Sequence, residues 1–218
     1  MTDDVDRWLS ELIRLYEDDE RLTDKQIKIL QAAVEIFAEK GYASTSTSEI
    51  AHRAGVAEGT IFRHYATKKD LLFSIVTPVM SKLVAPFVFR DFNKVLHLEY
   101  STYEEFVRAV IRNRIDFAQR YWPVLKVMVR EISFQPQLQA QFKVEVGTQV
   151  AQRIRRVIQY FQRQGEIVEF PPESVMRLTA SVVLGYLLTR FLWMSEKPWD
   201  DHKDVEEMVR FILHGLTP

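Results

Sequence analysis

The amino-acid sequence predicts an all-α protein with about nine to ten helices. Apolar residues recur at the spacing of amphipathic helices, whereas the period-two alternation of strands is hard to find. Only 7 glycines and 8 prolines occur among the 218 residues, so few positions break a helix. Hydrophobic residues make up 47% of the chain, which is enough to bury a sizeable core.

The composition argues against several classes of function. The formal net charge is −1, so a surface for nucleic acid would have to come from local charge. The absence of cysteine excludes disulfides, thiolate metal sites and cysteine nucleophiles. The 5 histidines lack metal-ligand spacing, and no glycine-rich phosphate loop is present. We therefore expect no catalytic residues, no metal and no cofactor, in a chain compatible with the cytoplasm.

The first expected element is an N-terminal extension over residues 1–22, with an amphipathic helix over 2–16. Its apolar side chains are Val5, Trp8, Leu9, Leu12, Ile13 and Tyr16. Asp3, Asp4 and Asp6 stand where a secretory signal needs basic residues. Because the polar face is acidic, it disfavours an anionic membrane, and we expect packing against the protein itself or a partner.

A compact helical unit is expected next, over residues 23–70. Its first helix begins after Thr23 as the cap and ends at Lys40, where Gly41 supplies the left-handed C′ position. Two short helices follow near 48–54 and 58–65. A further helix begins after its own threonine cap, Thr67. Pro78 is expected to kink it near Ser74, and Pro86 is expected to end it.

The two short helices have the spacing of a helix-turn-helix. Gly55 falls just past the first of them, where a positive φ allows a tight turn, and the small Ala54 lets the second helix cross closely. Ile61 and the ring of Tyr65 would form the inner face of the second helix. The side chains on its outer face would be Thr60, Phe62, Arg63 and His64. Such groups can meet base edges and phosphates in a major groove.

A series of short motifs spans Ile27 to Leu72. They are Ala33-x-x-x-Phe37, Gly41-Tyr42, Thr47-x-x-Ile50-Ala51, Ala54-Gly55-Val56, Gly59-Thr60-Ile61-Phe62-Arg63-His64-Tyr65 and Lys68-x-x-Leu71. In this order they resemble the DNA-binding domain of the TetR (tetracycline repressor) family. The rest of the chain shows no comparable motif, so there the resemblance rests on length and helix count.

The resemblance implies roles for individual residues. Thr47 would cap a helix and touch a phosphate, and Lys68 would meet the DNA backbone at the start of the following helix. The predicted DNA-binding residues are Thr45, Thr47, Thr60, Phe62, Arg63, His64, Tyr65 and Lys68. Phe62 and Tyr65 exchange the family's usual order of tyrosine and phenylalanine, which removes a hydroxyl contact from position 62.

The resemblance also implies a larger helical domain for ligand binding and dimerisation, over residues 71–218. The helices expected in it, from capping boxes, prolines and apolar spacing, are 101–121, 123–133, 136–164, 173–194 and 201–214. Pro123 would open the second of these, and Gly215 would stop the last.

Aromatic side chains are dense between residues 87 and 134, and there the resemblance implies a ligand cavity. The predicted lining residues are Phe106, Val110, Phe117, Trp122, Leu125 and Met128, with Arg108 or Arg112 near a mouth. Such a wall suits a small apolar or amphipathic effector, such as an aromatic drug or an acyl chain. For any single one of these residues, ordinary core packing is the alternative.

The helices expected over 173–194 and 201–214 are candidates for a dimer interface. Small residues that permit close approach are Ala180, Ser181 and Gly185, and apolar area comes from Val182, Leu184, Leu188, Leu192, Val205, Met208, Val209 and Ile212. The apolar run from Leu178 to Met194 contains Arg190 and is shorter than a typical membrane span, so we interpret it as a buried helix.

These observations predict a DNA-binding transcriptional repressor without a membrane partner. One recognition helix reads too few bases for useful specificity, so the chain is expected to bind double-stranded DNA at a palindromic operator as a homodimer. A small hydrophobic ligand would release it from the operator. The alternative is a helical scaffold whose acidic N-terminal helix recruits another protein. Deleting residues 1–20 would distinguish the two hypotheses, since a scaffold would lose its partner protein and a repressor would keep its operator.

Overall fold

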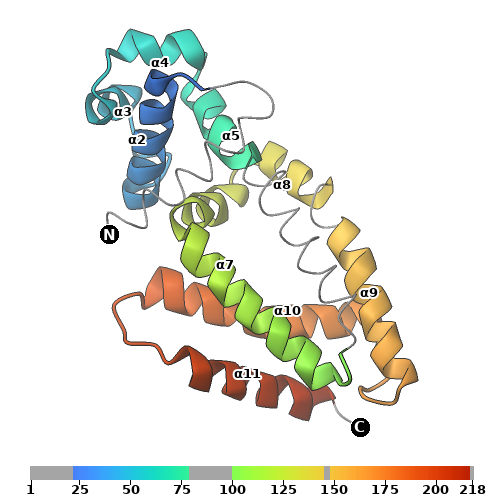
Figure 1. Ribbon diagram of the computed structural model, residues 1–218. Helices are drawn as coiled ribbons and strands as arrows, with labels where there is room; N and C mark the ends of the chain where they lie inside the picture. Colours follow the sequence, from blue (N-terminus) through green and yellow to red (C-terminus); the bar gives the residue numbers. More distant parts are fainter. Residues whose placement is uncertain (1–21, 79–99, 145–147, 217–218) are drawn as a thin grey trace. The chain divides into compact units, whose positions relative to one another are not determined.

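The computed structural model describes residues 22–78, 100–144 and 148–216, and every regular element in these ranges is helical (Figure 1). The elements are α2 (Asp24–Lys40), α3 (Thr47–Ala54), α4 (Glu58–His64), α5 (Lys68–Pro78), α7 (Tyr103–Ile132), α8 (Pro136–Phe142), α9 (Thr148–Arg163), α10 (Pro172–Leu188), a π-helical turn η3 (Thr189–Trp193) and α11 (Asp201–Leu216). The all-α prediction is confirmed over these ranges. The helix expected over 2–16 and the helix end expected at Pro86 lie outside them.

The chain divides into two compact units. The first unit comprises Met1–Pro86 and Arg120–Val146, and the second comprises Phe87–Gln119 and Gly147–Pro218. Within the first unit, the guanidinium of Arg130 donates to the carbonyl oxygen of Ala38 at 2.9 Å. The segment Arg120–Val146 therefore contacts α2. The expected boundary at residue 70, between a DNA-binding and a ligand-binding domain, stays a prediction.

Helix α2 begins and ends as its sequence predicts. Thr23 and Gln26 form a reciprocal capping box, in which the Gln26 amide donates to the Thr23 hydroxyl at 3.3 Å and the Thr23 amide donates to the Gln26 side chain at 3.0 Å. At the other end, Gly41 has φ 85° and its amide donates to the carbonyl of Phe37 at 2.9 Å. Helix α2 buries Ile29, Leu30, Ala32, Ala33, Val34, Ile36 and Phe37.

The prediction that Pro123 opens a new helix is wrong. Helix α7 runs without interruption from Tyr103 to Ile132. A proline inside a helix removes one backbone hydrogen bond and costs about 3 kcal/mol. Burial offsets this cost, because apolar side chains on both sides of the proline lie in the core. These include Phe117, Ala118, Tyr121, Val124, Leu125, Val127 and Met128.

Two further helix boundaries differ from expectation. The long helix expected from residue 136 to 164 is two helices, α8 and α9, and residues 145–147 between them lie outside the described ranges. Helix α11 continues through Gly215 to Leu216 instead of stopping there. Gly215 does not adopt a positive φ, and a glycine inside a helix costs only about 1 kcal/mol relative to alanine.

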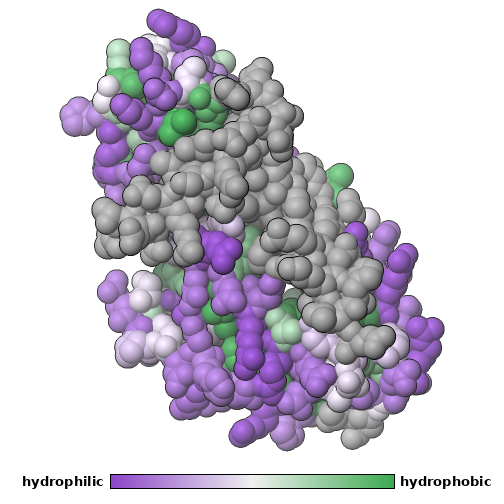
Figure 2. Space-filling view, viewed as in Figure 1, coloured by the Kyte–Doolittle hydropathy of each residue, from purple (hydrophilic) through white to green (hydrophobic). Residues whose placement is uncertain are grey.

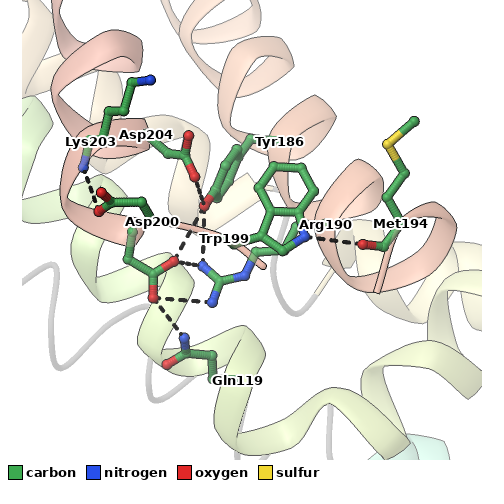
Figure 3. Close-up of polar contacts among 9 residues, drawn as sticks. Gln119, Tyr186, Arg190, Met194, Trp199, Asp200, Lys203 and Asp204 are labelled. Carbon is green, nitrogen blue, oxygen red and sulfur yellow. Dashed lines mark hydrogen bonds and ion pairs between the residues drawn. The ribbon is translucent and has the colours of Figure 1, made fainter. Parts of the chain in front are cut away.

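Arg190 joins the end of α10 to the start of α11 (Figure 3). Its guanidinium forms an ion pair with Asp201 and donates to the Tyr186 hydroxyl at 3.1 Å. Asp201 also accepts from the side-chain amide of Gln119, on α7, at 3.0 Å. The Tyr186 hydroxyl donates to Asp204 at 3.1 Å, and burial raises the pKa of Tyr186 to about 12. The phenol therefore stays protonated at neutral pH and can act as this donor.

The connection between the two helices is closed by a tryptophan. The indole of Trp199 donates to the carbonyl of Met194 at 3.0 Å, just after the π-helical turn η3 (Figure 3). Its ring also meets the ring of Tyr186 edge-on, with centroids 5.5 Å apart. We call the contacts of Tyr186, Arg190, Trp199 and Asp201 the hairpin clasp. It fixes α10 and α11 to each other as a helical hairpin.

The apolar helix expected to be buried is largely uncovered within one chain. Pro172–Trp193 is long and apolar enough to cross a membrane, with a mean hydropathy of 1.4 in its most apolar window, but only 11% of that window is buried. Leu178 and Leu184 are about half exposed on α10, and Phe211 is 70% exposed on α11. The earlier interpretation was wrong because one chain supplies too little apolar surface to cover this helix.

Candidate nucleic-acid interface

The start of α3 is capped by Ser46 and not by Thr47. Ser46 has an extended backbone, and its hydroxyl accepts from the Glu49 amide at 3.1 Å. Thr47 is the first helical residue, and its hydroxyl donates to the carboxylate of Glu58 at 2.6 Å. The sequence carried this signal, because Ser46-x-x-Glu49 has the form of a capping box. Thr47 instead links the start of α3 to the start of α4.

The turn between α3 and α4 depends on Gly55. Its φ of 66° and ψ of 35° place it in the left-handed region, which favours glycine. The amides of Gly55 and Val56 close the end of α3 on the carbonyls of His52 and Ala51, at 3.2 and 3.0 Å. Helix α4 then begins at Glu58. The predicted tight turn is confirmed.

Helix α4 has one buried side and one open side. Ile61 is fully buried, and Tyr65, directly after the helix, is 8% exposed, as expected for the inner face. Burial raises the pKa of Tyr65, whose hydroxyl is hydrogen-bonded with Ser74. On the open side, Phe62 is 48% exposed, and Arg63 and His64 are also exposed. Figure 2 shows mostly hydrophilic residues, with a few apolar ones, on the visible surface of α3 and α4.

The remaining predicted residues differ in how far they are buried. Thr60 and Thr47 are half-buried. Thr45 is 3% exposed, and its hydroxyl donates to the carbonyl of Gly41 at 2.8 Å. Lys68 is half-buried, with its ammonium group directed at the loop between α2 and α3. The structure therefore brings Thr60, Phe62, Arg63 and His64 together on α4, and it sets Thr45 and Tyr65 inside.

The cations of α3 and α4 differ in whether their charge is paired. Arg53 on α3 pairs with Glu35 at 3.3 Å and with Glu39 at 3.5 Å, so its charge is compensated within the domain. Lys40 pairs with Glu49 in the same way. Arg63 has no ion pair among the residues that the structure describes. Its guanidinium is therefore free to meet a phosphate or a guanine edge.

The comparison with known proteins identifies one segment of the chain. Residues 29–75 match the family described as bacterial regulatory proteins, tetR family. This segment has the sequence of a TetR-family DNA-binding domain. The fatty acid metabolism regulator protein of Bacillus subtilis is 42% identical to this chain over 60 residues. That match covers 28% of this chain and 31% of the relative, so the chain is aligned with less than a third of that relative's length.

Two comparisons extend over nearly the whole chain. The HTH-type transcriptional regulator YhgD of Bacillus subtilis is 23% identical over 208 residues, which cover 89% of this chain and 97% of the relative. The crystal structure of the TetR-family regulator PfmR from Thermus thermophilus has a TM-score of 0.67 at 20% identity. It covers 87% of this chain and 99% of that one. At this identity the likeness shows a shared fold.

Replacing Gly55 by alanine is expected to lower the free energy of unfolding by about 1 kcal/mol, because a Cβ is strained in the left-handed region. No atom lies within 4 Å of the added Cβ, so backbone strain is the only cost. Gly59, inside α4, has equally open surroundings and no positive φ. Gly59→Ala should therefore stabilise by about 0.5–1 kcal/mol. Chemical denaturation measures both variants, and effects of the same sign would contradict the left-handed turn.

Proposed function

We propose that this chain is a DNA-binding transcriptional repressor that reads a palindromic operator as a homodimer. The observation that carries the proposal is the open side of α4, where Phe62, Arg63 and His64 are presented by the Gly55 turn. A helix held in this way matches the recognition helix of helix-turn-helix proteins, which enters the major groove. Among the relatives that share this segment, one is named an HTH-type transcriptional regulator and another an HTH-type transcriptional repressor. The cytoplasm is the compartment that such a role requires.

The proposed dimer forms through α10 and α11. These helices expose Leu178, Leu184 and Phe211, three large apolar side chains of the type that a second subunit covers in a dimer. Gly185 and Ser181 are small enough to let a second copy approach closely. The hairpin clasp keeps the two helices in one arrangement, so the apolar face is preformed. A dimer also supplies the second recognition helix that a palindrome requires.

The proposed effector is a small apolar or amphipathic molecule. The six residues predicted to line its cavity lie along α7, and four of them, Phe106, Phe117, Leu125 and Met128, are buried. Relatives support an apolar class, since one is named a fatty acid metabolism regulator and a similar fold is described in complex with triclosan. Effector binding would lower operator affinity by changing the separation of the two recognition helices.

Selection from a random pool of duplex DNA should recover a palindrome. Arg63→Ala should then weaken binding to that palindrome by about tenfold or more, because a guanidinium contact to a base edge or phosphate is lost. Arg156→Ala removes the same charge from the exposed side of α9 and should leave binding unchanged. Fluorescence anisotropy measures both affinities, and sedimentation checks that each variant keeps its assembly state. Unchanged binding by Arg63→Ala would refute the role of α4.

Leu184→Glu and Phe211→Glu should each raise the dimer dissociation constant by about tenfold or more, because a charge would enter an apolar interface. Tyr160→Glu places the same charge on α9, at a side chain that is 48% exposed, and should leave the dimer intact. Sedimentation velocity across a dilution series measures the three variants. A dimer that tolerates glutamate at both positions would place the interface elsewhere.

Titration of the operator complex with decanoate, palmitate or triclosan should release the DNA for at least one probe. Val110 is one of the predicted lining residues, so Val110→Trp would fill part of the predicted cavity. It should raise the concentration needed for release by about tenfold, with operator affinity in the absence of probe unchanged. Anisotropy of labelled operator follows both quantities. Release that is equally sensitive in this variant would exclude the predicted lining, and operator affinity that none of the three probes changes would argue against an apolar effector.

A further inference from the structure

The ammonium group of Lys68 is engaged inside the DNA-binding segment. It donates to the carbonyl of Tyr42 at 2.8 Å and to the carbonyl of Thr45 at 2.6 Å. It also lies 4.4 Å from the centroid of the Tyr42 ring, at a distance where a cation is attracted to the ring face. An ammonium has three N–H donors, so two carbonyls and one ring account for all of them.

The loop that Lys68 holds is short and closed. It runs from Gly41, which has φ 85°, to Ser46, the cap of α3. Thr45 is buried in it, with its hydroxyl on the Gly41 carbonyl and its amide donating to the Tyr42 carbonyl at 3.3 Å. The loop thus brings its carbonyl oxygens to one side. Without a cation there, partly buried carbonyls would lose their strongest donor.

The ring below the ammonium is itself fixed. Tyr42 packs edge-on against Phe37, a buried residue of α2, with ring centroids 5.5 Å apart. Burial, with smaller contributions from the charges of Glu131 and Asp70, raises the pKa of Tyr42. The same negative charges favour an ammonium group at this place. Lys68 therefore occupies a prepared cation position rather than an open surface.

Lys68 is also held rigidly at its own end. It is the first residue of α5, and the preceding Thr67 caps that helix. The Thr67 amide and hydroxyl donate to the Asp70 carboxylate at 2.9 and 2.8 Å, and the Asp70 amide donates to the Thr67 hydroxyl at 3.1 Å. These reciprocal hydrogen bonds between Thr67 and Asp70 fix the first turn of α5. The loop before α3 is consequently linked to the start of α5 by one side chain.

We propose that Lys68 is a positioning residue, which fixes the loop between α2 and α3 and through it the start of α3, where Thr47 lies. This inference rests on the proposed DNA-binding function and changes the role expected of Lys68. A direct phosphate contact would require the ammonium to leave the two carbonyls. The link also means that a shift of α5 by about 1–2 Å, typical of regulatory helix movements, would break these bonds and release the loop.

Lys69 provides a matched control. It is the neighbouring residue on α5, it carries the same charge, and it is also half-buried. Its ammonium lies 5.5 Å from the centroid of the Phe73 ring, and its contact is with α5 itself rather than with the loop. Lys68→Met and Lys69→Met therefore make the same change in charge and length on one helix, and only the first removes the proposed link.

The first experiment is hydrogen exchange of the backbone amides of residues 42–47 in the free protein. Lys68→Met should raise their exchange rates by about tenfold or more, because the loop opens more often. Lys69→Met should match the unsubstituted protein. Tyr42→Leu keeps both backbone carbonyls but removes the aromatic ring, and it should raise the exchange rates by a smaller factor. This variant replaces Lys68→Met in the experiment if Lys68→Met does not fold. Unchanged exchange in Lys68→Met, or in Tyr42→Leu where that variant replaces it, would overturn the proposal.

The second experiment is the salt dependence of binding to the palindrome recovered by selection. Loss of a phosphate contact would reduce the slope of log affinity against log salt by about 1. Loss of a positioning residue should lower the affinity with the slope unchanged. A reduced slope with unchanged loop exchange would make Lys68 a phosphate contact and overturn the proposal. If the unsubstituted protein bound no DNA, the proposed function would fail, whereas the exchange experiment would still test the link.

Discussion

The left-handed backbone at Gly55 is the constraint on which the proposed DNA-reading surface depends. Helices α3 and α4 have 8 and 7 residues, and helices this short are not stable alone in water. Their stability comes from the turn and from the burial of Ile50 and Ile61, with α3 packed against both α2 and α4. Once the turn is set, the inward side of α4 is fixed. The exposed position of Arg63 and its neighbours then follows from helical geometry.

A charged side chain holds a junction in each unit. In the first unit, the ammonium of Lys68 donates to two backbone carbonyls of the loop before α3. In the second unit, the guanidinium of Arg190 forms an ion pair with Asp201 and donates to the hydroxyl of Tyr186. Both cations act mainly on groups within the same unit. Arg63 differs from both, because its side chain is exposed and forms no ion pair among the described residues.

The sequence was most informative where a local pattern has one structural solution. Thr23, Gly41, Gly55 and the family motifs predicted the helices of residues 23–70 to within about a residue. The cap at Ser46 was assigned one position late, although its capping box was present. The bonds of Lys68 could not be foreseen, because its partners are backbone carbonyls more than 20 residues away in sequence. Pro123 lies inside α7, although proline tends to break a helix, because burial of the apolar side chains around it outweighs this tendency. That burial depends on the folded chain and is not visible in the local sequence.

Helix α7 is the one described helix that contributes residues to both units, since the division falls between Gln119 and Arg120. Pro123 has no amide hydrogen to offer the carbonyl of Gln119, four residues earlier. The missing bond thus falls within one turn of the division. Helix α7 therefore lacks one of its axial hydrogen bonds in the turn where its residues pass from the second unit to the first. Loss of that bond lowers the local resistance of a helix to bending.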